Sequence, residues 1–281
     1  LALLLYATFT QVSLSTLNHA FQDIRFISIA LVGNFIFIPL IVWGLLHLLP
    51  NDPAMRLGVV LVLLVPCTDW FITFTQLGGG DTKRAIAFSP ISLLFQIVLL
   101  PVYTFIILGN QVTITDAKFD LFVAFFGIIL FPLLMAFITE KWAESSPRKQ
   151  RIIDNLGWFP VPLLAIVVFM IAASQASTIF EATSLLWYPT MVFTAFPIIT
   201  LFLAKGLSFM AKLPVRQSRV LAFSLGSRNS FVVLPLALAL PPSFQLAGLV
   251  IVLQSLIELF AMSIYIWFIP NVWFRRLSAD D

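Results

Sequence analysis

RLGVVLVLLVPCTDWFITFTQLGGGDTKR, residues 56–84, has the pattern of a membrane-spanning helix that is broken in the middle. An apolar half, residues 57–65, is followed by Pro66, and a second apolar half begins after Asp69. Proline lacks a backbone donor and disfavours the helical conformation of the residue before it. In lipid the freed backbone groups need partners, so such breaks persist only inside protein or beside a water-filled cavity. This break, with a carboxylate at the same depth, therefore predicts a functional site.

A second interrupted stretch lies at residues 219–240, RVLAFSLGSRNSFVVLPLALAL. We expect its helix to break at Gly226, as we expect the first to break at Pro66. Two interrupted helices in corresponding positions of two halves are typical of secondary transporters, in which the breaks form the binding site. The candidate substrate-binding residues are therefore the polar groups at the two breaks: Cys67, Thr68, Ser227, Arg228 and Asn229.

The composition is that of a membrane protein. The chain has 281 residues, of which 60% are hydrophobic and 10% charged. Repeated apolar runs of about twenty residues predict transmembrane helices, and their length and lack of alternation argue against strands. The single cysteine excludes an internal disulfide, and the sequence has no phosphate-binding loop, zinc-spacing cluster or nucleophile–base set. We expect an all-α integral membrane protein that is not an enzyme, with no cofactor and no nucleic-acid partner.

The apolar runs repeat in two halves. Nine spans are expected, at residues 1–17, 26–49, 57–77, 85–108, 116–139, 156–174, 185–204, 219–240 and 243–269. The chain starts at Leu1 inside an apolar run, so we expect that a first helix is missing. With it restored, each half has five helices and ends in a broken helix and a long helix. Five is odd, so the halves would insert as inverted repeats. We expect one transporter domain over residues 1–281, with repeats at 1–108 and 116–270.

Lysine and arginine positions predict the orientation, because cytoplasmic loops carry an excess of them. With Leu1 outside, Arg56 and Lys118 lie outside and Arg228 lies within the membrane. The other thirteen lie on the cytoplasmic side: Arg25, Lys83, Arg84, Lys141, Arg148, Lys149, Arg151, Lys205, Lys212, Arg216, Arg219, Arg275 and Arg276. We therefore expect a multi-pass protein of the cell (inner) membrane with a cytoplasmic C-terminus.

Three charged residues fall away from the ends of the predicted spans, namely Asp69, Arg228 and Glu258. Asp69 and Arg228 lie at the centres of the broken helices and meet if these helices cross. One interpretation is a buried ion pair that only fixes the crossing. The other is that Asp69 carries a transported proton or contacts the substrate, with Arg228 as its switchable counter-charge.

Glu258 and Cys67 also have two interpretations each. Glu258 lies midway along the last span, in IVLQSLIELFAMSIYI, with Gln254 and Ser255 one turn before it. It either exchanges protons or serves as a hydrogen-bonded packing contact between helices. Cys67 either packs in an apolar interior or, beside Thr68 at an unwound backbone, offers a soft ligand that suits soft metals and metalloids.

These residues carry a family resemblance. The chain resembles the bile acid/sodium symporter superfamily over essentially its whole length, and within it the arsenite-efflux permeases of the arsenical-resistance branch. In that branch a cysteine of the fourth of ten helices and a glutamate of the tenth are linked to arsenite transport. Cys67 in LLVPCTDWF and Glu258 in QSLIELF fall at the matching places. The resemblance implies a core domain with two crossing discontinuous helices and a separate panel domain.

The chain departs from this pattern at the second break. Sodium-coupled members have a motif there that is similar to Glu-Thr-Gly-Met-Gln-Asn-Ser, whereas this chain has SLGSRNS, residues 224–230. The position of the sodium-binding glutamate is Ser224, and that of the glutamine is Arg228. The resemblance therefore implies no conventional sodium site, and it favours proton coupling or uncoupled transport. Asp69 is also not expected in arsenite permeases, and Arg228 with half-helix N-termini would also accept an anion.

The leading hypothesis is a secondary active transporter that exports arsenite or antimonite in exchange for protons by alternating access. Cys67 would be the ligand that contacts the metalloid. Asp69 and Glu258 would carry the proton. Thr68, Ser227, Arg228 and Asn229 would line the substrate site. The alternative is an organic-anion carrier, sodium- or proton-coupled, in which Arg228 binds a carboxylate or sulfonate. A different class is a membrane receptor that binds the same substrate without moving it.

Overall fold

The computed structural model describes a bundle built from helices. Within the described residues no strand is present, and four helical segments are long and apolar enough to cross a membrane: Ile24–Leu48, Thr82–Thr104, Leu185–Met210 and Pro242–Trp273. The prediction of an all-α integral membrane protein is therefore confirmed. The described residues are 6, 9, 10, 23–108, 130–143, 149, 162, 166, 169 and 176–275, without the side chains of 105, 108 and 176–184.

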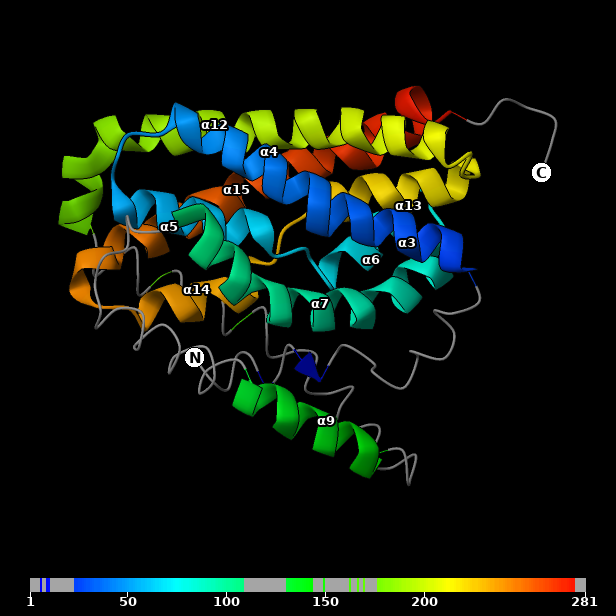
Figure 1. Ribbon diagram of the computed structural model, residues 1–281, viewed down its shortest axis with the longest axis horizontal. Coiled ribbons are helices and arrows are strands. Elements are labelled where there is room, and N and C mark those ends of the chain that lie inside the picture. Colours follow the sequence, from blue (N-terminus) through cyan, green and yellow to red (C-terminus); the bar gives the residue numbers. More distant parts are fainter. Residues whose placement is uncertain are drawn as a thin grey trace.

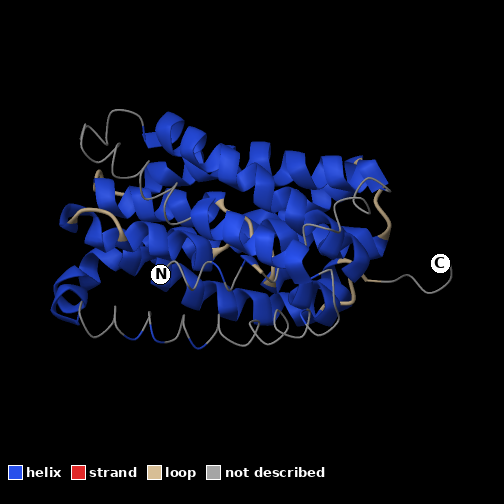
Figure 2. Ribbon diagram, turned by 90° about the horizontal axis from the view of Figure 1, so that it is seen from below, coloured by secondary structure: helices blue, strands red, loops and turns tan. Residues whose placement is uncertain are grey.

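The long helices run roughly along the long axis of the molecule (Figures 1 and 2). The first described span is continuous and consists of α3 (Ile24–Val32), the π-helical η3 (Gly33–Phe37), α4 (Ile38–Leu45) and the 3-10 turn η4 (Leu46–Leu48). Short π-helical turns within α-helices are frequent at functional sites. This one carries Asn34, whose side chain is fully buried.

Both interrupted helices are present as pairs of half-helices. They are α5 (Pro53–Leu64), α6 (Trp70–Leu77), α13 (Val215–Gly226) and α14 (Ser230–Leu238). α5 begins at Pro53 rather than at residue 57, because the Asp52 carboxylate accepts the Met55 N–H at 2.7 Å and caps the helix. Capping residues extend a helix beyond its apolar run, so hydropathy alone places such ends a turn too late.

α5 lies at the centre of the bundle, and its residues 57–64 are all buried. It packs against α15 (Gln245–Phe268) so closely that a Cβ added to Gly58 would lie 2.9 Å from the carbonyl oxygen of Ala247. Large apolar side chains are exposed on the surrounding helices, for example Phe260, which is 75% exposed. A buried central helix inside helices with apolar outer faces is the arrangement expected in lipid.

The remaining helices extend the predicted spans. They are α7 (Thr82–Leu108), α9 (Phe131–Ala143), α12 (Ala176–Met210), and the short turns η7 (Pro242–Phe244) and η8 (Ile269–Trp273) beside α15. α12 begins well before residue 185, because polar turns continue the helix beyond the lipid-compatible run. In Figure 1, α9 lies apart from the other labelled helices. The predicted spans 1–17 and 156–174, and the first part of 116–139, lie largely outside the described residues.

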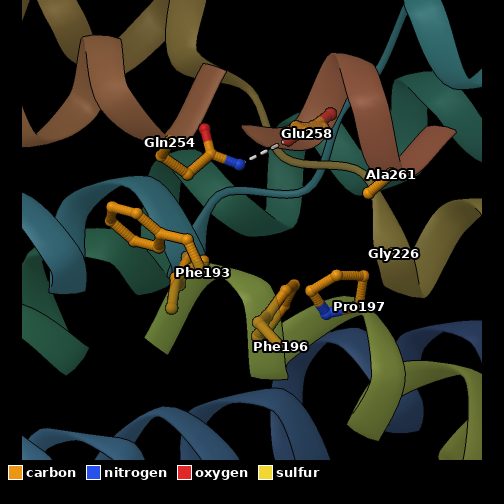
Figure 3. Close-up of a pocket in the computed structure, with 8 residues that line it drawn as sticks. Phe193, Phe196, Pro197, Gly226, Gln254, Glu258 and Ala261 are labelled. Atoms are coloured by element: carbon orange, nitrogen blue, oxygen red, sulfur yellow. Dashed lines mark hydrogen bonds between the residues drawn. The ribbon is translucent and has the colours of Figure 1, made fainter. Parts of the chain in front are cut away.

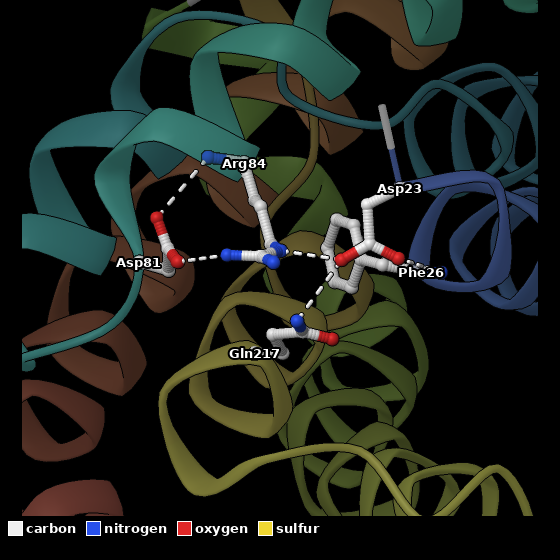
Figure 4. A network of polar contacts seen from close by, with 5 residues as sticks. All are labelled: Asp23, Phe26, Asp81, Arg84 and Gln217. Carbon is white, nitrogen blue, oxygen red and sulfur yellow. Dashed lines mark hydrogen bonds and ion pairs between the residues drawn. The ribbon is translucent and has the colours of Figure 1, made fainter. Parts of the chain in front are cut away.

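Charged and polar side chains join the helix ends at one end of the bundle (Figure 4). The Arg84 guanidinium contacts Asp23 at 2.6 Å and also contacts Asp81, while the Gln217 amide donates to Asp23 at 3.0 Å. Nearby, Arg219 donates to the carbonyl oxygens of Gly79, Pro270 and Phe274. These contacts tie the starts of α3, α7 and α13 to the turn after α6 and to η8, at the end predicted to face the cytoplasm.

Candidate functional site

The two helix breaks cross and pair with each other. Pro66 and Arg228 form an isolated antiparallel bridge. Around it, the Cys67 N–H donates to Ser227 O at 3.2 Å, and the Asn229 N–H donates to Val65 O at 2.8 Å. Each break therefore supplies partners for backbone groups that the other break frees, as the membrane interior requires.

Side chains at the crossing reinforce this pairing. Asn229 caps α14 by accepting the Val232 N–H at 3.2 Å, and its amide nitrogen donates to the Thr68 hydroxyl, also at 3.2 Å. The Ser89 hydroxyl of α7 donates to Thr68 O. Of the predicted substrate-binding residues, Thr68 and Asn229 are thus bonded to each other, and Ser227 donates its hydroxyl to Phe223 O at 2.8 Å.

Cys67 and Asp69 lie together on one side of the crossing. The Cys67 thiol is 3% exposed and donates to the Asp69 carboxylate at 3.4 Å. Asp69 is partly exposed and stands just before α6. In the described part of the chain, no group of three or more His, Cys, Asp or Glu could hold a metal ion.

Glu258 binds the second break. Its two carboxylate oxygens accept the Arg228 backbone N–H, both at 3.0 Å, and Oε2 also accepts from the Gln254 amide at 2.5 Å. Gln254 is in turn held by the Ser230 hydroxyl at 2.8 Å. The polar face predicted one turn before Glu258 is therefore used through Gln254. A carboxylate that only accepts hydrogen bonds fits its ionised form.

A small cavity adjoins Glu258 (Figure 3). Its volume is about 10 Å³, the size of about one water molecule. It is lined by Leu63, Phe193, Phe196, Pro197, Gly226, Gln254, Glu258 and Ala261. Phe193, Phe196 and Pro197 of α12 line the side of this space opposite Glu258 in Figure 3.

The Arg228 side chain points away from both carboxylates. Its guanidinium is buried and donates to four uncharged oxygens: Leu63 O, Ser224 O, Leu225 O and Asn34 Oδ1. Within the described residues it forms no ion pair with Asp69 or Glu258. The Asp69–Arg228 ion pair considered from the sequence is therefore absent, because the carbonyl oxygens at the ends of α5 and α13 are the nearer acceptors.

Sequence reasoning missed Asn34 as a member of this site. Its amide nitrogen donates to the Ser224 hydroxyl and to Ala30 O, each at 3.0 Å, and its oxygen accepts from Arg228. The available signal was a lone amide inside an otherwise apolar span. Phe196, whose ring centroid lies 5.4 Å from the guanidinium carbon, gave no signal that separates it from the other phenylalanines.

The model of the Sodium Bile acid symporter family matches residues 1–182. The chain belongs to this family. Its members are secondary transporters rather than enzymes, so the chain is a multi-pass membrane transporter. A search of curated proteins found no match.

The family match covers the first break and ends before the second. Pro66, Cys67 and Asp69 lie inside the matched residues, whereas Arg228 and Glu258 lie outside them. The symporter-family assignment therefore rests on residues 1–182, which include the first predicted repeat and the start of the second. The chemistry of the second break has to be argued from the geometry of this chain.

Proposed function

We propose that this member of the symporter family exports arsenite or antimonite in exchange for protons by alternating access. The observation that carries the proposal is the crossing itself. It brings a thiol and a carboxylate, Cys67 and Asp69, to one break and a second carboxylate, Glu258, to the other. A soft ligand and two proton-exchanging groups therefore share one pair of unwound helices.

Cys67 supplies the bond to the metalloid. Arsenous acid carries three hydroxyl groups on trivalent arsenic, and the thiol replaces one of them. A sulfur–arsenic bond forms, the arsenic–oxygen bond breaks, the thiol proton leaves with the hydroxyl as water, and arsenic stays trivalent. The Asp69 carboxylate, 3.4 Å from the sulfur, is placed to pass that proton. A single thiol ligand keeps the bond reversible, as a carrier requires.

Glu258 links proton binding to the shape of the break. Its ionised carboxylate accepts the Arg228 N–H and the Gln254 amide. Protonation removes the negative charge and weakens these charge-assisted hydrogen bonds. The backbone at Arg228 is then held less firmly, so proton occupancy and the conformation of the crossing become coupled.

The organic-anion alternative has less support. It needs the Arg228 guanidinium to face a substrate carboxylate or sulfonate, yet this group is 3% exposed and donates to four protein oxygens.

We also assign the end of the bundle that carries Arg84, Arg216 and Arg219 to the cytoplasm, in a cell (inner) membrane, by the positive-inside rule.

Arsenite flux in proteoliposomes tests the proposal. We expect arsenite uptake to be faster into inside-acidic than into inside-alkaline vesicles, to ignore sodium, and to be lost in Glu258→Gln. Ser255→Ala is the matched control, because Ser255 lies on the same helix and, among the described residues, its hydroxyl donates to Ile251 O of that helix. Absence of arsenite flux under every gradient would overturn the proposal, as would full proton-driven flux in Glu258→Gln.

A further inference from the structure

Two helix C-termini converge on the Arg228 side chain. α5 ends at Leu64 and α13 ends at Gly226. The last carbonyl oxygens of a helix have no intrahelical partner and carry the negative end of the helix dipole. Three such oxygens face the guanidinium, from Leu63, Ser224 and Leu225. Inside a membrane this concentration of carbonyl oxygens needs a cation or strong donors.

The guanidinium meets this need with short contacts. Nη1 donates to Leu63 O at 3.2 Å, and Nη2 donates to Ser224 O and Leu225 O, both at 2.8 Å. Nη2 also donates to Asn34 Oδ1 at 3.0 Å. All four acceptors are uncharged. Rings of carbonyl and amide oxygens of this kind are what proteins use to hold dehydrated monovalent cations.

The surroundings fix the shape of this oxygen cluster. The Asn34 amide nitrogen donates to Ala30 O and to the Ser224 hydroxyl, so its oxygen is turned toward Arg228. The Phe196 ring lies 5.4 Å from the guanidinium carbon and covers it on one side. The cluster is therefore held by contacts that do not involve Arg228, and it suits a flat cation.

We propose that Leu63 O, Ser224 O, Leu225 O and Asn34 Oδ1 form a cation site that the chain fills with its own Arg228 guanidinium. When the side chain is shortened, the site binds a free guanidinium ion. The native crossing therefore needs no dissolved cation to neutralise its helix ends. The proposal concerns the packing of the helix breaks and holds for any cargo, so it stands or falls separately from arsenite transport.

Thermal unfolding of Arg228→Ala in detergent, without any transport substrate, tests the proposal. Guanidinium chloride at about 10 mM should raise the Tm of this variant by roughly 3 °C and leave the wild-type Tm unchanged. Sodium chloride and choline chloride at the same concentration should give smaller shifts. Arg216→Ala is the matched control, because Arg216 is an exposed arginine at the start of α13, the half-helix that precedes the break at Arg228. It should behave as the wild type does.

A double variant tests the oxygen cluster directly. Arg228→Ala combined with Asn34→Leu removes one of the four oxygens, so the same rise in Tm should need about tenfold more guanidinium. Arg228→Gln is a second variant that also removes the guanidinium. If neither Arg228→Ala nor Arg228→Gln can be purified without guanidinium, we would instead compare the yield of folded protein that is solubilised with and without guanidinium. A higher yield with guanidinium supports the proposal.

Three results would overturn the inference. The first is an unchanged Tm, or an unchanged yield, of the Arg228 variants in guanidinium. The second is an equal rise in Arg216→Ala. The third is a rise with sodium at least as large as with guanidinium, which would remove the assignment of the site to a flat cation.

Discussion

Cys67 is the residue on which the identity of the cargo depends. Cys67→Ser replaces the thiol with a hydroxyl, which is a hydrogen-bond donor of similar size but lacks the soft sulfur ligand. We expect arsenite flux to fall by about tenfold or more, since each lost 1.4 kcal/mol of binding is tenfold in affinity. The measurement is arsenic content of vesicles over time. Unchanged arsenite flux in Cys67→Ser, with normal folding, would exclude a sulfur–arsenic bond in transport.

The depth of the ionisable residues could be predicted from the sequence, but their partners could not. Asp69, Arg228 and Glu258 stand out because they interrupt long apolar runs. Which of them pair depends on side-chain direction at the crossing, and no local pattern encodes it. Arg228 turns its backbone N–H to Glu258 and its guanidinium to carbonyl oxygens on α5 and α13. One residue thus makes two unrelated sets of contacts.

At the scale of elements, the close packing of α5 on α15 gives a stability prediction. Gly58→Ala places a Cβ 2.9 Å from Ala247 O and 3.0 Å from the Val250 Cβ, so the two helices have to move apart. We expect a loss of about 1–3 kcal/mol, visible as a lower Tm. Gly206→Ala is the control, because nothing lies within 4 Å of its added Cβ and alanine favours the helix. Equal Tm values for the two variants would contradict this account.

The polar contacts at the helix starts give a pH prediction. Partial burial alone would raise the pKa of Asp23, but hydrogen bonds from Arg84, the Phe26 N–H and Gln217, with the Arg84 charge, hold it below its ordinary value of 3.8. A lowered pKa stabilises the fold above the unfolded-state value and loses that contribution as the pH falls through the folded-state value.

Asp23→Asn should therefore lower the Tm near neutral pH, and the gap to wild type should close as the pH falls below 3.8. The measurement is thermal unfolding in detergent across this range. Gln217→Ala serves for comparison, because it removes a neutral donor to the same carboxylate. The difference in Tm between Gln217→Ala and the wild type should change much less with pH. A gap for Asp23→Asn that is constant with pH would rule out this ionic contribution.

The two breaks were predictable to different degrees. Pro66 marks the first, because proline cannot continue the ladder of α5. The second has no proline, and α13 ends at Gly226 because the next residues pair with the first break instead. A break that depends on a partner far away in the sequence leaves only polar residues as a local signal.

At the scale of the whole molecule, the orientation can be tested with engineered cysteines. The chain has one cysteine, so Cys67→Ser provides a cysteine-free background. Asn51, just before α5, and Arg216, at the start of α13, are both exposed, and the charge distribution predicts that they lie on opposite sides of the membrane. We expect an impermeant thiol reagent to label Asn51→Cys, and not Arg216→Cys, in intact cells. The reverse pattern would invert the predicted topology.

The repeat organisation remains a prediction. Each half, at residues 1–108 and 116–270, contains a broken helix followed by a long helix. In the first half these are α5–α6 and α7, and in the second half they are α13–α14 and α15. The helices that would complete a panel domain fall mainly at residues 1–17, 116–139 and 156–174, which are largely outside the described residues. Hydropathy predicts that they exist, but not where they pack.

Arg228 and Glu258 also set the electrical character of transport. When Asp69 is protonated, a crossing that moves as one body carries a fixed positive charge on Arg228 and a titratable negative charge on Glu258 through the membrane field. With Glu258 ionised these two charges cancel, and that movement does no electrical work. With Glu258 protonated one net positive charge moves, and each 100 mV across its path changes the free energy by about 2.3 kcal/mol. A negative interior would then draw the protonated crossing inward, so membrane voltage and proton load act on the same step.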